Sequence, residues 1–164
     1  IGSMNPEEGN LRPQIMDRFG LRVVTRGLDN NDDRLEAYFR ASHYLNNPFE
    51  FIQIYKDENN IARQEIENAR KFVWKVKIDP KIAKFGIELI KDLTIHSLRA
   101  ELTLFEAAKA LAATENRDYI TNEDIKTIAP MALRLRRSTY ITNFIENNKA
   151  ENEEINSSLD KILI

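Results

Sequence analysis

The sequence predicts a mainly α-helical protein in which a bundle of about four helices follows a small α/β segment. Apolar residues recur at helical spacing over most of the chain, and helix-starting and helix-ending residues punctuate them. The first residues differ, because two short strand-like runs, at 1–3 and 21–25, flank a short helical run. We therefore divide the chain into an α/β segment, residues 1–27, a helical domain, residues 28–140, and a C-terminal helix or tail, residues 141–164.

The α/β segment is predicted to contain one short helix over residues 11–19. Pro13 lies in its first turn, where a missing N–H costs nothing, and Gly20 can end it. Two isolated strands do not form a stable sheet. We therefore expect residues 1–27 to need a partner structure.

Helix caps predict the boundaries in the first half of the helical domain. Asn30 or Asn31 can cap a helix whose first turn holds two aspartates, and the Asn-Asn-Pro run at residues 46–48 ends it. A long helical segment is expected over residues 49–76, which residues 57–60 can interrupt. Trp74 at its end is expected to pack against the helical core.

The second half of the helical domain has equally clear starts. Pro80 at a first helical position follows Asp79, and Ser97 is the expected cap of an Ala- and Leu-rich helix that runs to about residue 116. Thr121 with Asp124 predicts a capping box for a helix that runs to about residue 137. The Asn- and Glu-rich tail predicts one weak amphipathic helix.

Composition excludes several classes of function. The 164 residues carry a formal net charge of −2, which argues against a general nucleic-acid binder. No cysteine is present, so disulfides and thiolate metal sites are excluded, and a cytoplasmic location is expected. His43 and His96 lack the close spacing of a zinc pair, so we expect no metal site. No apolar run approaches the roughly 20 residues that span a bilayer.

Two residues of the N-terminal segment suggest nucleotide chemistry. Asn5 ends the first strand-like run, where an amide can orient a water, and Arg18 ends the short helix, where a guanidinium can meet a phosphate. Simpler interpretations remain open: Asn5 as a turn residue and Arg18 as a cation at a helix C-terminus. Glu7 and Glu8 are interpreted as a solvated loop rather than paired catalytic carboxylates.

Several motifs, in order, resemble the ATPase subunits of magnesium chelatase over roughly residues 1–140. The broader group is the AAA+ ATPases, which includes the MoxR-like proteins. The N-terminal motif is specific for this family, whereas the Ala-rich helix alone would be weak evidence for it. The matching motifs are Asn5-Pro6-Glu7-Glu8-Gly9, Leu11-Arg12-Pro13-Gln14, Asp17-Arg18-Phe19-Gly20, Leu98-Arg99-Ala100-Glu101, Ala107-Ala108-Lys109-Ala110-Leu111-Ala112-Ala113, Ile120-Thr121-Asn122-Glu123-Asp124-Ile125 and Ala132-Leu133-Arg134.

The resemblance implies a role for each matching residue. Asn5 corresponds to the sensor-1 amide near the γ-phosphate, and Arg18 to the arginine finger that reaches the neighbouring subunit's nucleotide. Asp17 would position the finger or bridge subunits. Arg99, at a helix start, is placed ahead of Arg134 as the sensor-2 residue that contacts the nucleotide.

The sequence departs from the family pattern at two points, and it also contains a pair of arginines near residue 137. Leu135 stands where this branch usually has a histidine. The sequence contains no Gly-x-x-x-x-Gly-Lys-Ser/Thr loop and no acidic Walker-B strand, so both are expected before residue 1 of an intact subunit. Arg136 and Arg137 are interpreted as cations at a helix C-terminus rather than as a phosphate patch.

The resemblance implies a motor subunit that forms a ring and binds ATP with Mg²⁺ between neighbours. Hydrolysis of this ATP would drive a partner subunit that inserts Mg²⁺ into a porphyrin. This chain alone is expected to bind no cofactor and to be inactive. Two alternatives stay open: a MoxR-like chaperone ATPase acting on a von Willebrand-type partner, and a non-enzymatic helical adaptor.

Overall fold

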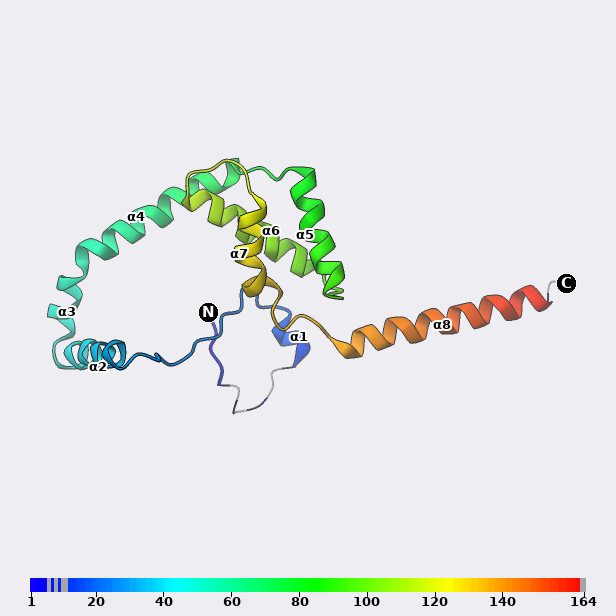
Figure 1. Ribbon diagram of the computed structural model, residues 1–164, viewed down its shortest axis with the longest axis horizontal. Helices are drawn as coiled ribbons and strands as arrows, with labels where there is room; N and C mark the ends of the chain where they lie inside the picture. The colour runs from blue at the N-terminus through cyan, green and yellow to red at the C-terminus, as the bar shows by residue number, and fades with distance from the viewer. Residues whose placement is uncertain (6, 8, 10–11, 163–164) are drawn as a thin grey trace. The chain divides into compact units, whose positions relative to one another are not determined.

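The computed structural model describes residues 1–5, 7, 9 and 12–162, and helices dominate them (Figure 1). The predicted mainly α fold class is confirmed. The elements are α1 (Pro13–Met16), α2 (Asn31–Asn46), α3 (Pro48–Ile54), α4 (Lys56–Phe72), a 3-10 turn (Val73–Lys75), α5 (Pro80–Asp92), α6 (Leu98–Thr114), α7 (Asn122–Leu133) and α8 (Thr139–Ile162).

The chain forms two compact units, and each combines separate stretches of sequence. The first unit contains residues 1–22, 78–108 and 121–164, and the second contains residues 23–77 and 109–120. Helix α6 contributes residues to both units. No helix in the described part of the chain is long and apolar enough to cross a membrane.

The two predicted strands were wrong, because residues 1–3 and 21–25 have no strand structure. A strand needs a neighbour for its backbone N–H and C=O groups. The N–H of Arg22 instead donates to the carbonyl oxygen of Met131, at the end of α7, over 2.8 Å. Among the described residues, β-pairing is limited to one isolated bridge between Lys77 and Tyr119.

The predicted helix starts are largely confirmed. The Asn30 side chain caps α2 by accepting the N–H of Asp32 at 2.7 Å. Thr121 and Asp124 form the predicted capping box of α7. Asp79 caps α5, where its side chain accepts the N–H of Lys81.

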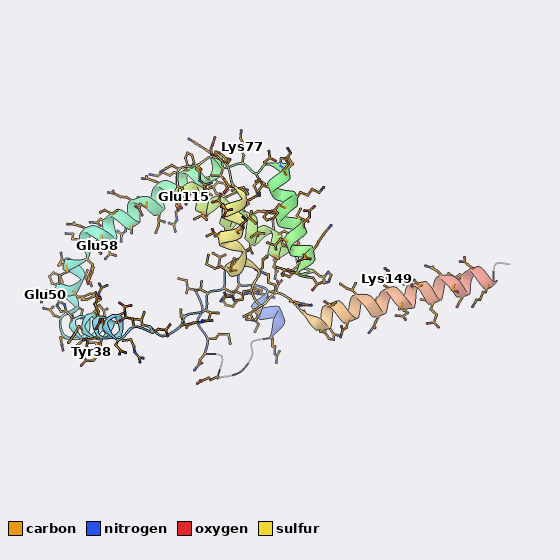
Figure 2. All side chains as sticks on the ribbon, in the orientation of Figure 1. Tyr38, Glu50, Glu58, Lys77, Glu115 and Lys149 are labelled. Carbon is orange, nitrogen blue, oxygen red and sulfur yellow. The ribbon has the colours of Figure 1, made fainter. Side chains whose placement is uncertain are left out.

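Other boundaries differ from the predictions. The interruption after α3 lies at Tyr55 rather than at residues 57–60. Helix α7 ends at Leu133 rather than near residue 137, and Leu135 follows with a left-handed φ of 57°. The tail forms α8, and from residue 143 to 161 every side chain whose burial is described is exposed, as Lys149 shows (Figure 2).

The core of the first unit is built around α6. Ala100, Leu104 and Ala108 recur every four residues on this helix and are fully buried. Ile90 of α5 and Ile125 of α7 complete the core with 1% and 0% exposure. The burial of Ala100, Leu104 and Ala108 shows that this face of α6 is covered by other parts of the protein.

Gly86 on α5 lies where another helix passes within contact distance. A Cβ atom at this position would lie 2.6 Å from Cε1 of Phe105 on α6. We expect Gly86→Leu to lower the free energy of unfolding by about 1–3 kcal/mol, because the added side chain overpacks this contact. Urea unfolding followed by circular dichroism at 222 nm measures the change.

Gly27 provides the matched control for this substitution. A Cβ atom there would meet no heavy atom within 4 Å. Gly27→Leu is therefore expected to leave the unfolding midpoint nearly unchanged. Equal midpoints for the Gly86 and Gly27 variants would contradict the close packing of α5 against α6.

The prediction that Trp74 packs into the core was wrong, because its exposure is 87%. Trp74 lies in the 3-10 turn, where residues three apart share one side. Val73 is half-buried and Val76 is buried, so these two valines take the inner side. Trp74, one position after Val73, therefore points away from them.

Candidate functional site

The candidate site lies in the first unit, in the turn that follows α1. The N–H of Arg18 donates to Ile15 over 3.1 Å, and the N–H of Phe19 donates to Met16 over 3.2 Å. These bonds continue the helical path beyond Met16. They place Asp17 on the partly buried side and leave Arg18 exposed.

Asp17 connects this turn to two later parts of the first unit. Its carboxylate accepts hydrogen bonds from Ser97 Oγ at 3.0 Å, Arg99 Nη1 at 3.3 Å and Arg136 Nη1 at 2.7 Å. Ser97 and Arg99 lie at the start of α6, and Arg136 lies three residues after α7. One carboxylate therefore joins the turn after α1 to the N-terminal end of α6 and to the segment after α7.

Arg136 is the buried centre of the site, with a side-chain exposure of 0%. Its Nε donates to the carbonyl oxygen of Ala132 at 2.7 Å, as expected for a cation at a helix C-terminus. Its Nη2 donates to the carbonyl oxygens of Phe19 and Gly20, both at 3.0 Å, and to Thr103 Oγ1 at 3.3 Å. The interpretation of Arg136 as a helix-terminal cation was thus incomplete, since most of its partners lie outside α7.

Arg22 forms a second buried connection in the same unit. Its guanidinium donates to the backbone carbonyl oxygens of Arg134, at 2.5 Å, and of Met16. Burial lowers the pKa of Arg22, and the nearby charge of Arg136 lowers it further, while Asp17 acts in the opposite direction. Arg22 and Arg136 both bind backbone carbonyl groups, so both hold the chain segment around Arg18.

The structure gives Asn5 a local hydrogen bond. Its Oδ1 accepts the backbone N–H of Glu7 at 3.2 Å, which is the bond expected of a turn residue. Its sensor-1 role remains a prediction. Asn5 and Glu7 are exposed, and Glu8 lies outside the described residues.

The two sensor-2 candidates differ in their surroundings. Arg99 forms an ion pair with Asp17 at 3.3 Å, and its side chain is 57% exposed. Arg134 is the C-cap residue of α7, and its side chain is exposed. Leu135, in place of the family's histidine, is 65% exposed. The structure thus brings Arg99 to the residue beside Arg18, whereas Arg134 reaches the site through its backbone carbonyl group.

No cluster of acidic, histidine or cysteine residues that could hold a metal ion occurs within residues 1–5, 7, 9 and 12–162. The exposed guanidinium groups of Arg18, Arg99 and Arg134 suit phosphate oxygens rather than a metal. The site can therefore contribute positive charge to a nucleotide, but the described residues offer no ligand set for Mg²⁺.

Comparison with known proteins shows what the chain is similar to. A family model described as the AAA lid domain matches residues 87–158. A "Magnesium-chelatase subunit ChlI homolog" from Methanocaldococcus jannaschii is 39% identical over 153 residues, which cover 92% of this chain and 42% of the relative. The chloroplastic magnesium-chelatase subunit ChlI of Glycine max is 38% identical over 136 residues, which cover 83% of this chain and 32% of the relative.

A solved structure gives the same indication at the level of the fold. The crystal structure of a candidate ATPase from Cytophaga hutchinsonii superposes with a TM-score of 0.52 and 26% identity, covering 78% of this chain and 41% of that one. The chain spans roughly two fifths of the length of the first of its curated relatives. The chain therefore matches the AAA lid domain over residues 87–158 and is similar, over most of its length, to ChlI subunits of magnesium chelatase.

Proposed function

We propose that this chain is part of an AAA+ motor subunit of the magnesium chelatase type. Such a subunit forms an oligomeric ring and hydrolyses ATP to drive a partner subunit that inserts Mg²⁺ into a porphyrin. The observation that carries this proposal is the 39% identity to a ChlI homologue over 153 residues, which include the exposed arginine candidates. The MoxR-like chaperone and the adaptor are not favoured, because the relatives from Methanocaldococcus jannaschii and Glycine max both carry the name of a chelatase subunit. A cytoplasmic location is part of the proposal.

The proposed division of labour follows the sequence. Residues 1–27 supply the last part of the ATPase core, residues 28–140 supply the lid, and residues 141–164 form a C-terminal helix. Arg18 serves the neighbouring subunit's nucleotide, and its exposed position supports that role because a finger must leave its own subunit. Asn5 serves the nucleotide of its own subunit.

The contacts of Arg99 bear on its proposed role as sensor 2. To reach a phosphate, its guanidinium must give up the 3.3 Å ion pair with Asp17. The Arg134 side chain has no such pair within the described part of the chain. An ion pair this exposed contributes only about 0–1 kcal/mol, so Arg99 stays the first proposed sensor-2 residue and Arg134 the alternative.

ATP with Mg²⁺ is the proposed cofactor of the intact protein. Arginines of this chain fit its phosphate groups, and ATP supplies the phosphoryl group that is transferred to water. The phosphate-binding loop and the Mg²⁺ ligands would come from the upstream core. A Walker A motif about 150–200 residues upstream of Ile1 in the genomic sequence, a spacing set by typical domain sizes, is the simplest test.

The isolated 164-residue chain is expected not to bind ATP tightly, because it contains no loop that surrounds a β-phosphate. Titration of the chain with a fluorescent ATP analogue and Mg²⁺ is expected to show no saturation at micromolar concentrations. Saturable micromolar binding would contradict the proposed need for an upstream core.

A further inference from the structure

The backbone on both sides of Arg18 is held by one buried side chain. Arg136 donates to the carboxylate and the carbonyl oxygen of Asp17, which precedes Arg18, at 2.7 and 3.3 Å. It also donates to the carbonyl oxygens of Phe19 and Gly20, which follow Arg18, at 3.0 Å each. Arg18 itself stays exposed between these fixed neighbours.

The same guanidinium is anchored to two lid helices. Its Nε donates to the carbonyl oxygen of Ala132 on α7, and its Nη2 donates to Thr103 Oγ1 on α6. A guanidinium presents five donors in a rigid plane, whereas a lysine presents one compact ammonium group that cannot reach all of these acceptors together. We propose that Arg136 is a positioning residue for Arg18, because it holds the backbone on both sides of residue 18 against α6 and α7 and thereby sets the direction of the Arg18 side chain.

The functional part of this inference rests on the proposed role of Arg18 in hydrolysis. A misplacement of about 1 Å can cost about 10²-fold in rate, even when the change lies away from the reacting atoms. Loss of the Arg136 contacts would let the turn after α1 move, although the charge of Arg18 is unchanged. The expected defect is in the rate of hydrolysis and not in nucleotide binding.

The mobility of residue 18 can be measured without any ATPase activity. The chain contains no cysteine, so Arg18→Cys provides a unique attachment point for a nitroxide spin label. Adding Arg136→Ala is expected to sharpen the electron paramagnetic resonance spectrum of this label. Arg137→Ala is the matched control, because Arg137 is an exposed arginine next in sequence, and it is expected to leave the spectrum unchanged.

A second labelled site separates local release from general unfolding. Thr127 is exposed on α7, and a label at Thr127→Cys is expected to keep its spectrum in the Arg136→Ala background. Should Arg136→Ala fail to fold, Arg136→Lys keeps a buried cation and is expected to release the label at residue 18 in part. An unchanged label at residue 18 in the folded variant, or equal changes at residues 18 and 127, overturns the inference.

The kinetic consequence is tested in the intact ATPase. Arg136→Lys is expected to lower kcat by about 10²-fold and to leave KM for ATP unchanged, whereas Arg137→Lys is expected to alter neither. A raised KM with an unchanged kcat would assign Arg136 to nucleotide binding and overturn the positioning role. If the wild-type protein shows no ATPase activity, the proposed function fails, and the spin-label result still decides whether Arg136 positions residue 18.

Discussion

Arg18→Ala in the intact protein is expected to abolish ATP hydrolysis while nucleotide binding is retained. An arginine finger can contribute about 10³–10⁵ in rate, because its charge stabilises the γ-phosphoryl oxygens in the transition state. Arg18 is exposed, so its replacement removes no buried contact and is expected to leave the fold intact. Steady-state phosphate release gives the rate, and titration with a fluorescent ATP analogue gives the affinity.

Mixing wild-type and variant subunits tests whether Arg18 acts on a neighbour. A subunit with Arg18→Ala is expected to regain hydrolysis at its own nucleotide when a wild-type subunit supplies the missing guanidinium. Arg137→Ala is the control, since it removes an exposed arginine outside the proposed site. Full ATPase activity in an all-variant ring would show that the finger assignment is wrong.

Asp17→Ala is expected to lower the stability of the first unit clearly. It removes the acceptor of the 2.7 Å bond from Arg136, whose side chain has no exposure, and leaves that charge without its carboxylate. Breaking a buried ion pair costs about 3–5 kcal/mol. Because the Asp17 side chain is itself 35% exposed, we expect a smaller loss of about 2–3 kcal/mol in the free energy of unfolding.

Arg99→Ala is the matched control for the loss of Asp17. It removes another ion-pair partner of the same carboxylate, but this pair is solvent-exposed, with 57% exposure on the arginine side chain. Exposed pairs contribute about 0–1 kcal/mol, so the expected change is within that range. Urea unfolding monitored by circular dichroism compares the variants, and equal losses would contradict the central position of Arg136.

Local sequence patterns were sufficient to predict most helices. Caps such as Asn30 and Thr121 act within three residues, so their effect can be recognised in the sequence itself. The strands at residues 1–3 and 21–25 were predicted wrongly, because strand composition does not show whether a partner is available. Trp74 was misplaced for a related reason: its burial depends on the local 3-10 turn, which the sequence does not reveal.

The candidate site also depends on contacts that local sequence patterns do not reveal. The resemblance suggested Asn5, Arg18, Arg99 and Arg134 as candidate residues, and suggested that Asp17 positions the finger or bridges subunits. The central role of Arg136 was missed because its partners Phe19 and Gly20 are 117 and 116 positions away. The sequence does not show which of two adjacent arginines is buried. Only the three-dimensional structure shows that Arg136 is buried and Arg137 is exposed.

The long sequence separation within the first unit has a consequence for synthesis on the ribosome. Asp17 and Arg136 are 119 positions apart, so their contact closes a large loop and must form late. Residues 1–22 leave the ribosome before the other stretches of the same unit, which begin at residues 78 and 121. A growing chain that has not yet reached residue 136 cannot complete this unit. The turn that carries Arg18 is therefore expected to take its final conformation only after residue 136 has been translated.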